Sequence, residues 1–167
     1  MTSRTLNNMF RFIFLILLQV MVLNNINLLG NLNPQLYILF IILYPFNSNQ
    51  SVLLILSFLL GLGVDFFENS GGINAAACLV IAAIRPWVLR FSFGISYDYQ
   101  TVKFSSTPVG ARMSYVGILI LVHHFCLFLL EFFSFAHLLL ILEKTIFTGL
   151  FTLVLVFLSL ALFKRKK

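Results

Sequence analysis

The sequence predicts an all-α integral membrane protein with six transmembrane helices and both ends of the chain in the cytoplasm. Three observations carry this prediction: the apolar composition, the spacing of the apolar runs, and the positions of the basic residues. The 167 residues are 60% hydrophobic and only 10% charged, whereas soluble domains average about 25% charged residues. A soluble domain of this size could not bury so many Leu and Phe side chains, because much of its surface stays exposed.

The apolar runs divide the chain into six expected spans within a single transmembrane domain. That domain covers 1–167, with spans at about 9–29, 35–46, 52–67, 73–90, 112–137 and 145–163. The first run follows two arginines, as the apolar part of a signal peptide does. A series of asparagines follows it in place of a small-residue cleavage site, so we expect it to remain as the first span.

The second span is only about 12 residues long, a length that also fits a re-entrant segment. The basic residues favour a full crossing, because cytoplasmic loops are enriched in Lys and Arg. With six spans, all of the 11 basic residues except Lys144 lie on one side of the membrane. Without the second span, the loop that carries Arg85, Arg90, Lys103 and Arg112 moves to the opposite side. Local thinning of the bilayer can accommodate a short span.

Polar and small residues line one face of the third span. Within an arc of about 80° on a helix lie Ser57, Gly61, Asp65 and Glu68. A matching stripe on the fourth span begins at Asn74, and small residues on facing stripes favour close antiparallel packing.

An ionisable residue inside a span, such as Asp65, is a functional-site hypothesis. Asp65 either takes hydrogen bonds from the turn around Gly72, fixes the hairpin of spans three and four, or receives a partner helix. A proton pump is disfavoured, because span three has no further ionisable residue on the cytoplasmic side of Asp65.

The fifth span carries a second group of polar residues. His124 and Glu131 are seven residues apart and share a helix face, whereas His123 points about 100° away from His124. The pair is interpreted as an ion or proton site, a buried contact between helices, or a contact with another protein. A metal site made of His123, His124 and Cys126 has poor helical geometry. Neither cysteine is expected to form a disulfide, since both lie inside apolar runs.

The sequence contains no nucleophile elbow, phosphate loop or catalytic carboxylate pair. It therefore predicts a protein that is not an enzyme, with no cofactor and no metal. No basic stretch interleaved with aromatic residues suggests nucleic-acid binding. The polar stretch 91–111 is either an amphipathic hairpin or irregular, and the basic tail 164–167 is interpreted as a topology anchor that favours anionic lipid.

The hairpin of spans three and four resembles a known family. The pattern GLGVDFFENSGGINAAACLVIAAIRPWVLR, followed by a basic loop, is similar to rod shape-determining protein MreD, in the form found in Bacteroidetes-type bacteria. The family places an acid late in one span, then a short glycine-containing turn, then a span of small residues. Asp65, Gly72 and Ala75 to Ala77 stand at those positions.

The resemblance implies a non-catalytic protein of the bacterial inner membrane that binds the single-span protein MreC. It further implies membership of the cell-elongation complex with MreB, RodA and a class B penicillin-binding protein, which controls peptidoglycan synthesis and cell shape. The implied fold resembles the six-helix substrate-binding component of ECF vitamin transporters. The alternative function is that of such a component, a small-molecule binder, which would need a polar cavity of ligand size between the spans.

Overall fold

The computed structural model describes residues 3–26, 33–46, 48–94 and 107–162. The described part of the chain is helical, and five of its helices are long and apolar enough to cross a membrane. These helices are α1 (Ser3–Met21), α3 (Gln50–Glu68), α4 (Ile73–Phe93), α6 (Val109–Phe132) and α7 (Leu138–Leu162). The chain is a helical, multi-pass membrane protein, as its composition predicts.

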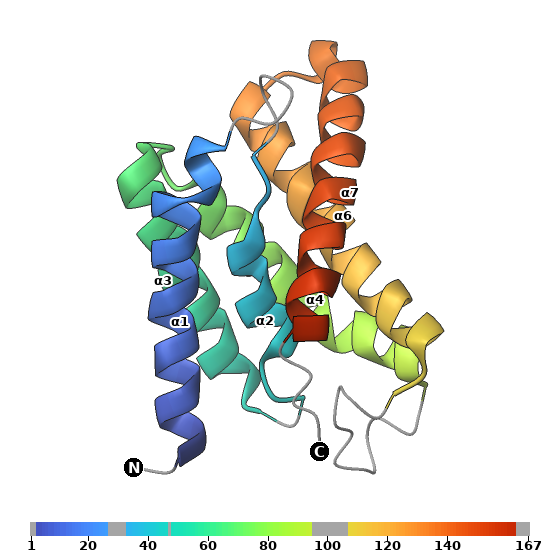
Figure 1. The fold of residues 1–167 in the computed structure, drawn as a ribbon. Helices are drawn as coiled ribbons and strands as arrows, with labels where there is room; N and C mark the ends of the chain where they lie inside the picture. Colours follow the sequence, from blue (N-terminus) through green and yellow to red (C-terminus); the bar gives the residue numbers. More distant parts are fainter. Residues whose placement is uncertain (1–2, 27–32, 47, 95–106, 163–167) are drawn as a thin grey trace.

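The long helices pack in chain order, with α3 against α4, α4 against α6, and α6 against α7 (Figure 1). Helix α1 packs against α3. Helices α1 and α7 stand on either side of the short helix α2, Leu39–Leu43 (Figure 1). We call the end of the bundle with the α3–α4 and α6–α7 turns the hairpin end.

The inserted segment, residues 33–46, fills the space between α1 and α7 (Figure 1). It is non-helical at residues 33–35, continues as the 3-10 helix η2 (Leu36–Ile38) and the short helix α2 (Leu39–Leu43), and then becomes extended at Tyr44. The prediction of one continuous helix over 35–46 is wrong, because Pro34 and Pro45 flank a helical stretch of only eight residues. A single continuous helix would need about 20 residues to cross.

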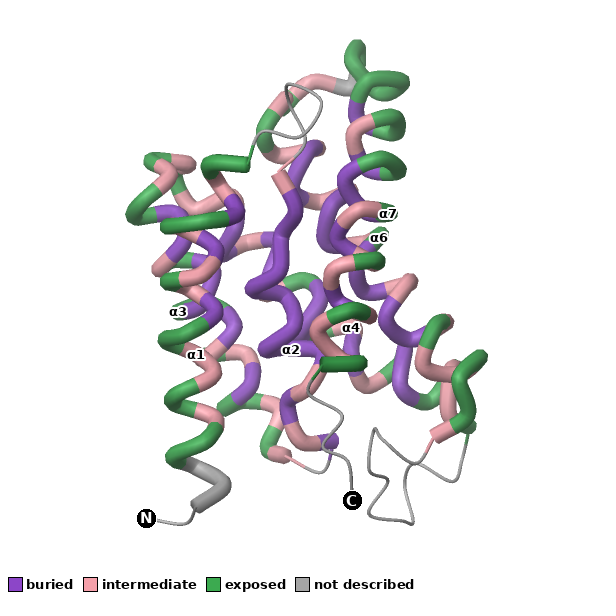
Figure 2. Tube along the Cα trace, in the orientation of Figure 1, coloured by how far each residue is buried: buried purple, intermediate pink, exposed green. Residues whose placement is uncertain are grey.

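The inserted segment is also the most buried part of the protein (Figure 2). Tyr37, Ile38, Phe40, Ile41 and Ile42 are each at most 1% exposed. By contrast, many large apolar residues on the outer faces of the long helices are exposed, for example along α1 and α7 (Figure 2). This distribution suits a protein surrounded by lipid, with the polar backbone of the irregular segment shielded inside it.

The boundaries of three spans, the first, fifth and sixth, differ clearly from the expectations. Helix α1 begins at Ser3 and ends at Met21, followed by the 3-10 helix η1 (Leu23–Asn25), so it starts and stops earlier than 9–29. The turn after α6 occupies residues 133–137, where Phe133 adopts a left-handed conformation and η4 (Phe135–His137) follows.

Helix α7 therefore begins at Leu138 instead of 145. It can include Lys144 because that ammonium lies 3.7 Å from the Glu131 carboxylate on α6. Most of the polar stretch 91–111, at 95–106, and the basic tail 164–167 lie outside the described residues.

Candidate functional site

The Asp65 carboxylate caps the N-terminus of α4. Its Oδ1 accepts a hydrogen bond from the backbone N–H of Asn74 at 3.0 Å, and its Oδ2 accepts one from the N–H of Ala75 at 2.8 Å. The hydroxyl of Ser70, in the turn, donates to the same Oδ1. The first N–H groups of a helix have no partner inside the helix, and the positive end of the helix dipole favours an anion there. The Asp65 side chain therefore holds the end of α3 to the start of α4.

Asn74 joins this hairpin to the inserted segment. Its Nδ2 donates to Asp65 Oδ1 at 3.1 Å and to Glu68 Oε2 at 2.8 Å. Its Oδ1 accepts from the Tyr37 hydroxyl at 2.7 Å. Because both sides of the amide have partners of the correct kind, the orientation of the Asn74 side chain is fixed.

Gly61 permits the closest approach between α3 and α4. A methyl group added to Gly61 would lie 2.5 Å from the Asn74 carbonyl oxygen and 2.5 Å from the Ala75 Cα. Gly72, with a φ of 95°, supplies the left-handed turn before α4. The residues predicted on spans three and four therefore meet at this turn, including the half-buried Glu68, which accepts from Asn74. The buried Ser57 hydroxyl has no partner among the described residues.

The face of α3 that carries Ser57, Gly61 and Asp65 is turned toward α4 and is buried. A second protein could reach it only by displacing α4. In the folded chain this stripe serves packing within the protein, and the hypothesis that it receives a partner helix stays a prediction.

The two histidines on α6 have different partners and different tautomers. The single hydroxyl hydrogen of Tyr37 is donated to Asn74, so the 3.1 Å contact between Tyr37 and His123 Nε2 requires a proton on Nε2. His124 Nδ1 lies 2.8 Å from the Ile120 carbonyl and must carry the proton, which leaves its Nε2 to accept from Thr152. Both imidazoles are fully buried.

His124 and Glu131 share a face of α6 but do not meet. His124 contacts the buried Thr152 on α7, whereas the Glu131 carboxylate is exposed and lies against Lys144 near the start of α7. The Lys144 ammonium also lies 4.9 Å from the ring centre of Phe132, a cation–π contact. These are two separate contacts between α6 and α7, so the arrangement offers no shared ion site.

Gln19 and Thr152 provide hydrogen-bond partners for the backbone at the N-terminal end of the inserted segment. Gln19 Oε1 accepts from the Leu36 N–H at 2.8 Å, and its Nε2 donates to the Pro34 carbonyl at 2.9 Å. Thr152 Oγ1 accepts from the Gln35 N–H at 3.1 Å. Side chains from α1 and α7 thus replace the hydrogen bonds that a continuous helix would have made within itself.

Arg85 and Tyr115 hold the other end of the inserted segment. Arg85 is 2% exposed, and its guanidinium donates to the Tyr44 carbonyl and, at 2.9 Å, to the Tyr115 hydroxyl. Tyr115 in turn donates to the Ile42 carbonyl at 3.1 Å. The last carbonyls of a helix carry partial negative charge, so a buried cation is well placed against the end of α2.

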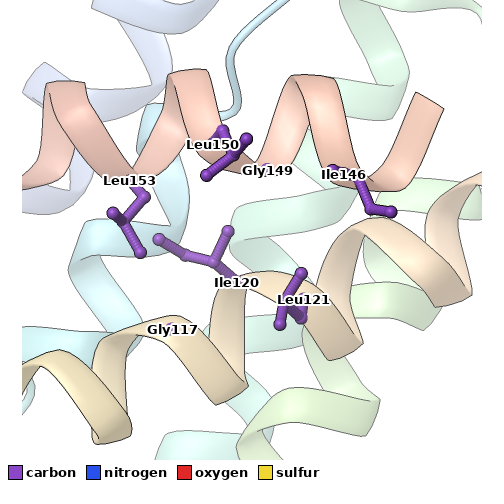
Figure 3. A pocket seen from close by; sticks show the side chains of 7 residues that line it. All are labelled: Gly117, Ile120, Leu121, Ile146, Gly149, Leu150 and Leu153. Atoms are coloured by element: carbon purple, nitrogen blue, oxygen red, sulfur yellow. The ribbon is translucent and has the colours of Figure 1, made fainter. Parts of the chain in front are cut away.

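An apolar groove lies on the outside of the bundle between α6 and α7 (Figure 3). Its volume is about 130 Å³, and its lining includes Gly117 on α6 and Gly149 on α7 (Figure 3). The lining side chains are all aliphatic, so the groove offers no hydrogen bond to a polar ligand.

Several polar residues of the site were not singled out from the sequence: Gln19, Tyr37, Tyr115 and Thr152. The available signal was a polar side chain within an apolar run, which is costly in a membrane unless it has a partner. Within the described residues, no three His, Cys, Asp or Glu side chains are placed to hold a metal ion. Comparisons with protein-family models, curated proteins and solved structures find no match to this chain.

Proposed function

We propose that this chain is a non-catalytic component of the bacterial inner membrane that binds MreC and acts in the cell-elongation complex, as MreD proteins do. The proposal rests on the resemblance of the Asp65 hairpin to that family. MreB, RodA and a class B penicillin-binding protein are then the expected indirect partners, and peptidoglycan synthesis and cell shape are the expected processes.

One structural observation favours an interaction role over ligand binding: the middle of the bundle is filled by protein. The inserted segment occupies that space with side chains that are almost completely buried. Among the described residues, the groove between α6 and α7 holds about 130 Å³, so this particular groove is smaller than the roughly 300–1,000 Å³ typical of sites for small molecules. A protein of this kind acts most readily through its lipid-facing surface, where packing and interhelical hydrogen bonds drive association.

Co-purification tests the proposed partner. Tagged chain and MreC from the same organism, co-expressed and extracted in mild detergent, are expected to elute as one complex. An unrelated single-span protein of equal abundance serves as the control for nonspecific association. Recovery of MreC at the level of that control would contradict the proposal.

Ligand capture tests the alternative, a vitamin-binding transporter component. The buried polar groups of Tyr37, Asn74 and His123 at the hairpin end are the feature that such a role would use. Tight, saturable binding of a vitamin-sized molecule by the purified chain would favour that alternative and count against the interaction role.

We further propose that the inserted segment makes a sixth crossing, with both ends of the chain in the cytoplasm. Its helical part contributes about 14 Å, and its six non-helical residues would add at most about 20 Å if the chain were fully extended there. Together these match the roughly 30 Å of the hydrocarbon core. Alkaline phosphatase fused to the C-terminus is expected to be inactive and a cytoplasmic fluorescent reporter active; the reverse pattern would contradict six crossings.

A further inference from the structure

The buried face of α7 toward the inserted segment carries three threonines. Thr145, Thr148 and Thr152 lie on one side of the helix and are at most 5% exposed. The Thr152 hydroxyl is fully used, since it accepts from Gln35 and donates to His124. The hydroxyls of Thr145 and Thr148 have no partner among the described residues.

Gln35 carries another unsatisfied oxygen and lies beside Thr152, which is one helical turn from Thr148 on the same face of α7. Its backbone N–H contacts Thr152, and its buried Oε1 lacks a partner in the described part of the chain. Two residues earlier, toward the hairpin end, the Oδ1 of Asn33 is also buried and unsatisfied. We call the region bounded by Asn33, Gln35, Thr145 and Thr148 the threonine seam.

A buried hydroxyl or amide oxygen without a hydrogen bond is costly, and proteins commonly satisfy such groups with ordered internal water. We propose that the threonine seam binds ordered water molecules that extend from the hairpin end of the bundle to the Thr152–His124 contact. This inference is independent of which partner the protein binds.

The chemistry of the seam favours water over a cation or a charged solute. The seam residues are amides and hydroxyls without a carboxylate, so a bound cation would have no neutralising charge. The Glu131 carboxylate, which lies near the start of α7, is paired with the Lys144 ammonium at 3.7 Å. Water can both donate to Gln35 Oε1 and accept from a threonine hydroxyl, which matches the unsatisfied groups.

X-ray hydroxyl-radical footprinting of the purified full-length protein tests this site, because radicals formed from bound water modify the side chains beside it. His124 is expected to be oxidised although it is fully buried. Phe40, an aromatic side chain that is 1% exposed, is the dry control, and the exposed His137 is the positive control. Modification of His124 no greater than that of Phe40 would overturn the proposal.

Thr148→Val removes one hydroxyl while keeping the shape of the side chain, and Thr148→Ser keeps the hydroxyl. If water is bound, Thr148→Val lowers both His124 oxidation and the melting temperature, whereas Thr148→Ser retains the oxidation. If the seam is dry, Thr148→Val raises the melting temperature instead, because it removes an unsatisfied group. A sodium-dependent rise in melting temperature that Thr148→Val abolishes would identify a cation site and would also overturn the water proposal.

Discussion

Replacing Asp65 with leucine is expected to lower the free energy of unfolding by about 3 kcal/mol or more and to reduce accumulation of the protein. The carboxylate receives the N–H groups of Asn74 and Ala75 and the amide of Asn74. Leucine would leave these donors buried without partners and would release the start of α4. Unfolding of the purified variant in mixed detergent micelles, together with its level in membranes, measures the effect.

Two further variants separate the cause of this loss. Ala76→Leu adds a leucine to α4 at a half-buried position outside the cap and is expected to have a much smaller effect. Asp65→Asn keeps the shape but turns an N–H₂ group toward one of the donors, so its stability should lie between the wild type and Asp65→Leu. Equal stability of Asp65→Leu and the wild type would show that the cap does not hold the hairpin.

The Asp65 variants also bear on the proposed partner. Under the proposed function, Asp65→Leu should recover less MreC per folded molecule than Ala76→Leu in the co-purification, because the proposed MreC-binding surface would depend on the position of α4 that the Asp65 cap fixes. Recovery should be normalised to folded protein in each preparation. A normalised recovery equal to that of the wild type would restrict Asp65 to a role in stability.

Replacing Gly61 with alanine is the second change with a large expected effect, at about 3 kcal/mol of destabilisation, the upper part of the range for overpacking. The new methyl group meets backbone atoms of Asn74 and Ala75 at 2.5 Å. Backbone cannot rotate away as a side chain can, so α3 and α4 must separate along their contact. The same unfolding measurement in micelles gives the magnitude.

Two other glycines provide matched controls for Gly61→Ala. Gly110 has open space around its Cα, so Gly110→Ala should be neutral or stabilising by up to about 1 kcal/mol, as a better helix former. At Gly63 the new methyl group would meet the end of the flexible Ile16 side chain at 3.0 Å, which predicts a small cost. Destabilisation of the same size at all three positions would contradict a specific close approach at Gly61.

The class of fold could be predicted from the sequence because lipid imposes a simple composition on the surface of a protein. The residues that join α3 to α4 could also be found, since Gly61, Asp65 and Asn74 interrupt otherwise apolar runs at helical spacing. Their partners within the hairpin are close in sequence, so local geometry restricts the possibilities.

The structure of the inserted segment could not be predicted in the same way. Its hydrogen-bond partners come from distant helices: Gln35 pairs with Thr152, 117 residues later, and Tyr115 pairs with Ile42, 73 residues earlier. Periodicity within the segment contains no information about those partners. The predicted start of the last span at 145 is late for a related reason, because Lys144 belongs to α7, where its ammonium pairs with the Glu131 carboxylate of α6.

The inserted segment also constrains how the protein is made. Its non-helical peptide groups depend on Gln19, which is synthesised earlier, and on Thr152, which is synthesised 117 residues after Gln35. Before α7 arrives, the N–H of Gln35 would face hydrocarbon, which is unfavourable for a peptide group. The segment therefore settles only when α7 has entered the membrane, so its pairing has to wait while the helices between them in the sequence are made.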